Sequence, residues 1–170
     1  ATMLGAQQRL VITFEDFASV RVVSDPQISP DGQWVLYAVR TADLTANRRT
    51  TRTWLAPVSG GGARQFPDDK TMAAEARWAP DGKSVAYTNG GQLWIAPPSG
   101  AGARQLTTLT GGASGPVWAT SGEHIAFVSA VYPECRDDAC NAARDKAKSE
   151  SRVKAHIADE LLFRHWNAYD

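Results

Sequence analysis

The chain has 170 residues, of which 43% are apolar, so it can bury the core of one domain and does not have the composition of a disordered segment. Lysine plus arginine and aspartate plus glutamate each number 18, so there is no net charge to recruit nucleic acid or an anionic membrane. No stretch approaches the roughly 18 consecutive apolar residues of a transmembrane helix.

Residues 1–20 are predicted to form an N-terminal extension with a short helix. Thr13 and Asp16 fit a capping box, in which two side chains satisfy the first amides of a helix, so we expect a helix from Phe14 toward Val20. Phe14, Phe17 and Val20 would share one face of that helix. We expect this face to pack against a neighbouring surface rather than to be exposed.

A repeat of about forty residues dominates the rest of the chain. WLAPVSGGGARQ (54–65) recurs as WIAPPSGAGARQ (94–105), and ISPDG (28–32) recurs as WAPDG (78–82) and WATSG (118–122). The first interval between the turn motifs is fifty residues, because ten extra residues lie in the segment TADLTANRRTTRT. The first repeat therefore has a longer hairpin.

Each repeat predicts a small antiparallel sheet. Proline sets φ at the first turn corner, aspartate bonds its own backbone and glycine accepts a positive φ, while VLYAV, VAYT and IAFVS are rich in strand-forming residues. An all-β repeat of this length predicts a partial β-propeller of four-stranded blades, with the repeated tryptophans packed between blades. Residues 21–170 are predicted to form this incomplete propeller, with blade 1 at about 24–66, blade 2 at about 74–107 and blade 3 from about 116.

An insertion at 132–160 is expected within blade 3. From Asp137 to His156 the chain has no glycine or proline and is rich in alanine and charged residues, which predicts a solvated helix. The alternative is that this insertion, like the basic loop at 48–52, projects to an entrance or to another subunit.

Two cysteines, Cys135 and Cys140, lie within the insertion. They could form a disulfide if their Cα atoms lie within about 7 Å, which would indicate an oxidising compartment, or remain free thiols. A zinc site is disfavoured, because only His156 or His165 could complete its ligand shell. We expect a periplasmic or secreted protein, with the cytoplasm as the alternative.

No residue of the chain is predicted to be catalytic. The nearest approach to a Gly-x-Ser-x-Gly nucleophile motif, GASGP (112–116), fails at its last position and is assigned to a loop between blades. His124 occupies a strand position of the repeat. His156 and His165 flank the predicted helix with no nucleophile in reach.

The repeats and their flanks resemble a known family. SDPQISPDGQWVLYAVR (24–40), ARWAPDGKSVAYT (76–88), the opening TFEDF (13–17) and LFRHWN (162–167) are similar to the N-terminal propeller of the prolyl oligopeptidase family of serine peptidases, in its acylaminoacyl-peptidase and dipeptidyl-peptidase branch. The resemblance covers about Phe14 to Tyr169. It implies a downstream α/β-hydrolase domain with a Ser-Asp-His triad, which these residues do not include.

By this resemblance, the intact protein hydrolyses short peptides without a cofactor, and this chain acts as a gate that filters access to the serine. The implied partners are the remainder of its own polypeptide and a peptide substrate, with a homo-oligomer as a further option. Two alternatives stay open: a lasso-peptide isopeptidase of the same family, and a non-catalytic binding propeller like TolB.

Overall fold

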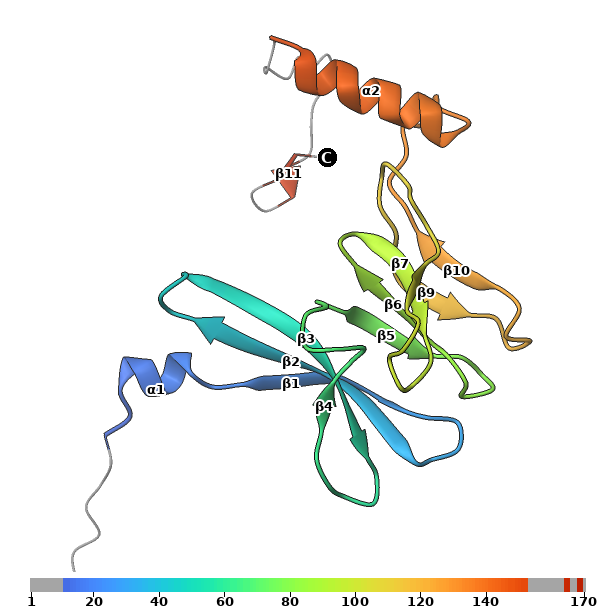
Figure 1. Ribbon diagram of the computed structural model, residues 1–170. Helices are drawn as coiled ribbons and strands as arrows, with labels where there is room; N and C mark the ends of the chain where they lie inside the picture. Colours follow the sequence, from blue (N-terminus) through green and yellow to red (C-terminus); the bar gives the residue numbers. More distant parts are fainter. Residues whose placement is uncertain (1–10, 153–163, 166–167, 170) are drawn as a thin grey trace, which may run out of the picture. The chain divides into compact units, whose positions relative to one another are not determined.

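The computed structural model describes residues 11–152, 164–165 and 168–169 (Figure 1). They fall into two units, residues 1–130 and 131–170, which are described separately below. No helix in the described residues is long and apolar enough to cross a membrane.

In the first unit, the described residues form a short helix and three antiparallel sheets. The helix is α1 (Phe14–Ala18). The first sheet has the order β1 (Val22–Ile28), β2 (Trp34–Asp43), β3 (Arg48–Pro57), β4 (Arg64–Gln65). The second has the order β5 (Ala74–Trp78), β6 (Val85–Asn89), β7 (Gln92–Ala96), β8 (Arg104–Gln105), and the third pairs β9 (Ser114–Trp118) with β10 (Ile125–Val128). The predicted fold class, a partial propeller with four-stranded antiparallel blades, is confirmed.

The long first hairpin is also confirmed. Strands β2 and β3 have 10 residues each, whereas the equivalent β6 and β7 have 5. The extra residues extend the pairing beyond Tyr37 and Trp54 as far as Asp43 opposite Arg48. The added segment therefore lengthens the hairpin within the same sheet.

The turn motifs adopt the same hydrogen-bonded conformation in all three repeats. The glycine amide donates to the carbonyl three residues earlier: Gly32 to Ser29 (2.8 Å), Gly82 to Ala79 (2.9 Å) and Gly122 to Ala119 (2.9 Å). In the first turn the Asp31 carboxylate also accepts from the Ser29 hydroxyl and the Gln33 amide, and these bonds hold the pKa of Asp31 below its usual 3.8.

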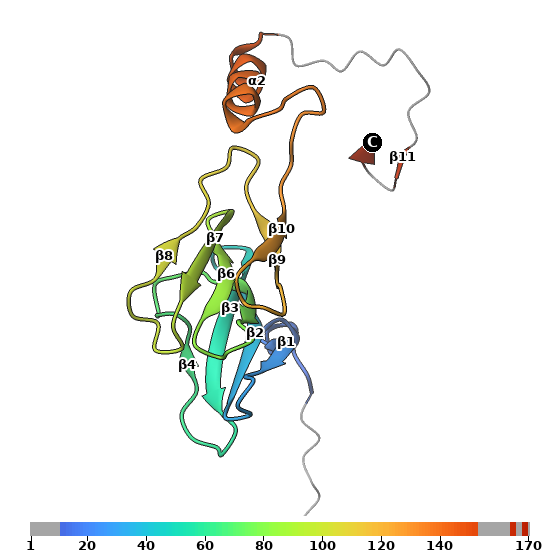
Figure 2. The ribbon, with the colours of Figure 1, turned by 90° about the vertical axis from the view of Figure 1, so that its right-hand side faces the viewer.

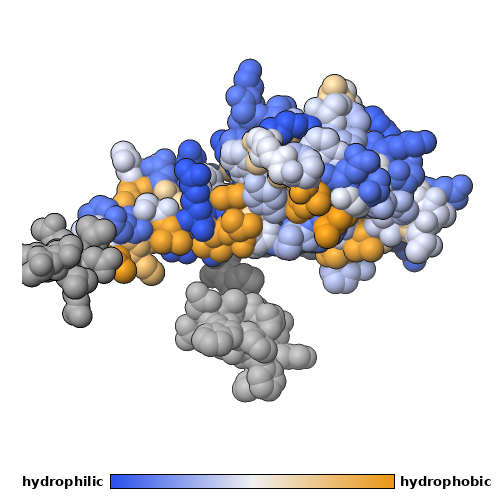
Figure 3. Space-filling view, turned by 90° about the horizontal axis from the view of Figure 1, so that it is seen from below, coloured by the Kyte–Doolittle hydropathy of each residue, from blue (hydrophilic) through white to orange (hydrophobic). Residues whose placement is uncertain are grey.

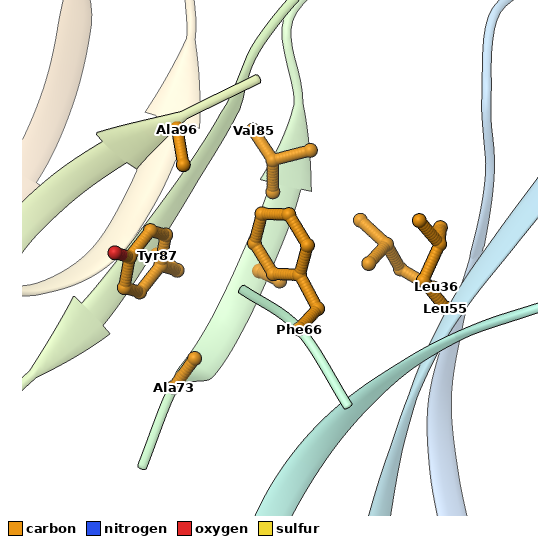
Figure 4. Packing of buried hydrophobic residues seen from close by; sticks show 8 residues of the cluster. Leu36, Leu55, Phe66, Ala73, Val85, Tyr87 and Ala96 are labelled. Atoms are coloured by element: carbon orange, nitrogen blue, oxygen red, sulfur yellow. The ribbon is translucent and has the colours of Figure 1, made fainter. Parts of the chain in front are cut away.

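The main core lies between the first two sheets (Figure 4). Phe66, which follows β4, is fully buried, and its ring lies between Tyr87 of the second sheet and Leu36 and Leu55 of the first. The rings of Phe66 and Tyr87 meet edge to face, with centroids 5.6 Å apart and an interplanar angle of 84°. This arrangement is favoured by the aromatic quadrupoles, so the pair joins two blades through one contact.

We expect burial of Tyr87 to make the protein sensitive to alkali. Burial, with a smaller contribution from the Asp68 carboxylate, raises the pKa of Tyr87 to about 12, against 10 in an unfolded chain. The folded state therefore binds this proton more tightly, so the stabilisation is present below pH 10 and is lost as the pH rises toward 12. Urea unfolding of the wild type and Tyr87→Phe across this range should show a steeper loss in the wild type. Parallel curves would contradict the prediction.

The prediction for α1 is correct in its cap and wrong in its packing. Thr13 accepts from the Asp16 amide, and the Asp16 carboxylate accepts from the Thr13 amide, so the capping box is present. The helix ends at Ala18, short of Val20. Phe14, Phe17 and Val20 are 69%, 71% and 60% exposed, because no described element of this unit covers them.

The second unit begins with a loop that is closed by a disulfide. Cys135 and Cys140 are bonded, with their Cα atoms 5.5 Å apart, and the bond lies at the start of α2 (Asp138–Glu150). The Asp137 side chain caps this helix by accepting from the Cys140 amide (2.8 Å). Buried Asn141 accepts from the Tyr132 amide and donates to the Asp137 carbonyl, which holds the loop against the helix.

The expected solvated helix is therefore present within 137–156, although residues 153–156 lie outside the described residues. Further along, β11 (Arg164–His165) pairs with β12 (Ala168–Tyr169) as a separate two-stranded sheet.

Candidate functional site

The first strands of the three sheets lie side by side and carry charged residues that connect one sheet to the next. Strand β5 is in contact with both β1 and β9, so the first strands of successive sheets are neighbours (Figure 1). Figure 2 shows β4 and β8, the last strands of the complete sheets, along the opposite side. We call β1, β5 and β9 the inner strands, because they are the first strands of successive sheets and lie next to one another.

Each inner strand contains an irregularity at the same place in the repeat. The residues there are Asp25, Glu75 and Gly115, with φ values of 52°, 51° and 58°, and in each sheet the pairing register shifts around them. A positive φ is uncommon for residues other than glycine and typically re-aims a side chain. In two of the three repeats that side chain is a carboxylate.

The carboxylate of Asp25 reaches from the first sheet to the second. It accepts from Arg77 Nη1 at 2.7 Å and from Gln27 Nε2 at 3.1 Å. The Arg77 and Asp25 side chains are 34% and 36% exposed, so solvent screens the ion pair and its contribution to stability is modest. Its geometric effect is to hold one cation and one anion on adjacent inner strands.

Glu75 makes the corresponding connection from the second sheet to the third. Its Oε2 accepts from the Gly115 amide at 2.9 Å and from the Thr88 hydroxyl at 3.3 Å. The acidic residue of one repeat thus bonds to the inner strand of the next.

Two indoles link the inner strands in the reverse direction. Trp78 Nε1 donates to the Gln27 carbonyl at 3.2 Å, and Trp118 Nε1 donates to the Arg77 carbonyl at 3.1 Å. These two tryptophans occupy the same position of their repeats. The expectation that the repeated tryptophans pack between blades is confirmed for this position.

We expect Glu75→Ala to loosen the junction between the second and third sheets. The Gly115 amide would lose its acceptor, at a cost of about 0.5–1.5 kcal/mol, whereas Glu75→Gln keeps a carbonyl oxygen and should cost less. Urea unfolding gives the two costs, and hydrogen exchange of residues 111–118 should accelerate only in the alanine variant. Equal behaviour of the two variants would show that the bond to Gly115 is unimportant.

The charged side chains of the inner strands make bonds between sheets, and the histidines considered in the sequence lie outside these strands. The assignment of His124 to a strand is wrong by one residue: it lies directly before β10, and it makes no side-chain hydrogen bond to a described residue. Within the described part of the chain, no three histidine, cysteine or acidic side chains gather as a metal site. His156 lies outside the described residues, and of His165 only the backbone in β11 is described.

The assignment of 112–116 to a loop is wrong in part. Ser114, Gly115 and Pro116 belong to β9, because the start of this strand pairs with β10, with Ser114 opposite Val128. Ser114 is therefore an exposed inner-strand residue, not the tip of a nucleophile turn.

Sequence reasoning missed the acidic positions of the inner strands. A signal for them exists: Asp25 and Glu75 are fifty residues apart and Glu75 and Gly115 forty, the same intervals as the turn motifs that follow them. Aligning the repeats three residues further upstream would have found these positions. The positive φ values of Asp25 and Glu75 and their bonds to the next sheet could not have been predicted from the sequence.

Comparisons with known proteins give sequence relatives among peptidases. No family model matches the chain. It is 32% identical over 76 residues to dipeptidyl-peptidase 5 of Porphyromonas gingivalis and 30% identical over 77 residues to the uncharacterised peptidase YuxL of Bacillus subtilis. Each match covers 45% of this chain, and the chain spans only 11% and 12% of the two relatives.

The fold comparison leads to the same group of proteins. Acylaminoacyl peptidase of Pyrococcus horikoshii superimposes on 71% of this chain with a TM-score of 0.58 and 21% identity, and the match covers 19% of that protein. At this identity the match shows the fold alone. Taken with the sequence relatives, it confirms the resemblance: the chain has a β-propeller fold that is also found in an acylaminoacyl peptidase, and it is similar in sequence to named peptidases.

Proposed function

We propose that the chain is part of the propeller of a serine peptidase that hydrolyses short peptides, of the acylaminoacyl- or dipeptidyl-peptidase type. The observation that supports this proposal is the sequence relationship to two named peptidases in a chain with a propeller fold. The described residues offer binding groups without a nucleophile and base in contact. In this proposal, the chemistry is performed by an α/β-hydrolase domain of the whole protein.

The proposed role of these residues is to filter access to that domain. Asp25, Arg77 and Glu75 are held by bonds that cross from one sheet to the next, so the spacing of the inner strands is set by the same contacts that place their charges. In this proposal the inner strands form the wall of the propeller's central channel, which admits an extended peptide more readily than a folded domain.

A fluorophosphonate probe that labels activated serines tests the proposed chemistry. We expect the whole protein to be labelled, and we expect prior treatment with phenylmethylsulfonyl fluoride to block the label. Absence of label, with a known serine peptidase reacting in parallel, would contradict the proposal and favour a non-catalytic binding propeller.

The filter is tested separately by substrate size. The whole protein should hydrolyse a short peptide and leave the same sequence intact within a folded protein. Asp25→Ala and Glu75→Ala remove the bonds between inner strands. These substitutions should raise the rate of cleavage of the folded protein more than that of the short peptide. If both substrates respond equally, the wall is not the filter, even when the serine label is present.

We also propose that the protein resides in an oxidising compartment, periplasmic or extracellular. The bond between Cys135 and Cys140 supports this, since disulfides persist mainly outside the cytosol. Alkylation of protein taken directly from cells should leave both cysteines unmodified until a reductant is added. Immediate alkylation of both would contradict the proposal.

A further inference from the structure

A groove lies at the ends of the three inner strands. It has a volume of about 570 Å³ and is lined by apolar residues of all three sheets: Ile28, Pro30, Trp78, Pro80, Val117 and Trp118. Ile28 and Val117 are 67% and 62% exposed, and Figure 3 shows apolar surface, in orange, among hydrophilic side chains on the underside of the molecule. The volume lies within the roughly 300–1,000 Å³ of pockets for small ligands, so the groove can hold a few residues of a peptide.

The walls of this groove are fixed by contacts between neighbouring sheets. The indole nitrogens of Trp78 and Trp118 are bonded to backbone carbonyls of the preceding inner strand, which leaves the carbon atoms of their rings for contact with a ligand. A Cβ atom on Gly82 would lie 3.5 Å from Pro30 Cδ, so the proline of the first turn packs against the glycine of the second. The groove is therefore formed before a ligand binds, which lowers the cost of binding.

Arg77 is the only charged residue among the described residues that line the groove. Its Nη1 donates to Asp25 Oδ2 (2.7 Å) and to the Ala76 carbonyl (2.8 Å), and these two bonds hold the guanidinium in place. Its Nε and Nη2 make no hydrogen bond to a described residue. Two adjacent guanidinium nitrogens can donate to both oxygens of a carboxylate, so a carboxylate is the group that this arginine suits best.

Further sheets of the propeller would not cover Arg77. Strand β5 has an inner strand on each side, β1 and β9, so additional blades of a ring would be added beside those two strands. A ligand in the groove must supply an acceptor for Arg77 and apolar side chains for the tryptophans. The carboxyl-terminal end of a peptide provides both, because its one carboxylate lies next to its last side chain.

We infer that the groove binds the carboxyl-terminal end of an apolar peptide, with the terminal carboxylate on Arg77 and the last side chains against Trp78 and Trp118. The inference deepens the proposed function, because it names a class of peptide that the inner strands select. It rests on the proposed function for the fate of the bound peptide, whereas binding itself can be measured whether or not the protein has a reactive serine.

Binding of the peptide Gly-Pro-Leu-Phe, labelled with fluorescein at its amino terminus, tests the inference. The whole protein is first treated with phenylmethylsulfonyl fluoride to prevent hydrolysis. Fluorescence anisotropy should show binding of the free acid and at least tenfold weaker binding of the carboxyl-terminal amide. Arg77→Gln should remove this difference, whereas Arg104→Gln, at an exposed arginine of β8 outside the groove, should keep it. Asp25→Asn breaks the same ion pair but keeps the cation, so its preference for the acid should remain.

Val117→Ser provides a second test, which does not depend on charge. It should weaken binding of the acid and of the amide alike. Val23→Ser, at a valine of β1 that has nearly the same exposure and lies outside the groove, is the matched control and should leave binding unchanged.

Equal affinity for acid and amide, or no effect of Arg77→Gln, would overturn the inference. So would an amidated peptide with an internal glutamate that binds as tightly as the free acid, because the ligand would then be an acidic side chain. Failure of the whole protein to bind the peptide would overturn it as well, and a serine label on that sample would leave the proposed function standing. Binding without a serine label would support the inference and contradict the proposed chemistry.

Discussion

Replacing Phe66 with alanine is expected to destabilise the protein by about 3–5 kcal/mol. The side chain is completely buried and fills the space between Tyr87 of one sheet and Leu36 and Leu55 of the other. These neighbours belong to strands held by their own hydrogen bonds, so they cannot collapse into the cavity that alanine would leave. Since a domain is typically stable by only about 5–15 kcal/mol, urea unfolding should show a large shift of the midpoint.

Phe14→Ala is the control for this substitution. It removes the same atoms from a side chain that is 69% exposed, so it should change the stability of a dilute sample by no more than about 0.5 kcal/mol. A cost below about 1 kcal/mol for Phe66→Ala would contradict the role of Phe66 as the centre of the core between the two sheets.

Replacing Gly100 with alanine should be similarly damaging, at about 2–4 kcal/mol. Gly100 has a φ of +83°, and a Cβ atom there would lie 2.1 Å from the Pro67 carbonyl oxygen and 2.9 Å from its carbon. Both atoms belong to the backbone, and Pro67 is buried, so neither can move aside without shifting the chain that positions Phe66. Thermal and urea unfolding give the cost.

Gly102 offers a matched comparison two residues away. Its φ is +67°, but a Cβ atom would meet nothing within 4 Å. Gly102→Ala should therefore cost only the backbone strain, about 1–2 kcal/mol. Equal costs at the two positions would show that the contact with Pro67 relaxes easily.

The predictable part of the fold was encoded in short segments. The turn motifs at 28–32, 78–82 and 118–122 contain the residues that their conformation requires, and the ten extra residues before Trp54 indicated a longer hairpin. The cap of α1 was likewise predictable from Thr13 and Asp16. Each of these features depends on residues within a few positions of one another.

Features that depend on distant partners were not predictable. Ser114 looked like part of a loop because glycine and proline surround it, yet pairing with β10 makes it a strand residue. The exposure of Phe14 and Phe17 depends on which surfaces reach α1. Nothing in the immediate sequence decides any of these.

The sequence by itself therefore determined the repeat, its strands and turns, and the propeller class, because backbone propensity and side-chain alternation act over a few residues and recur in every blade. Only the tertiary structure decided which groups share the inner edge. Asp25 meets Arg77, and Glu75 meets Gly115, across 52 and 40 residues of chain. Such bonds depend on how one sheet is stacked on the next, and that spacing is set by the packing of whole side chains between sheets, which no local pattern specifies.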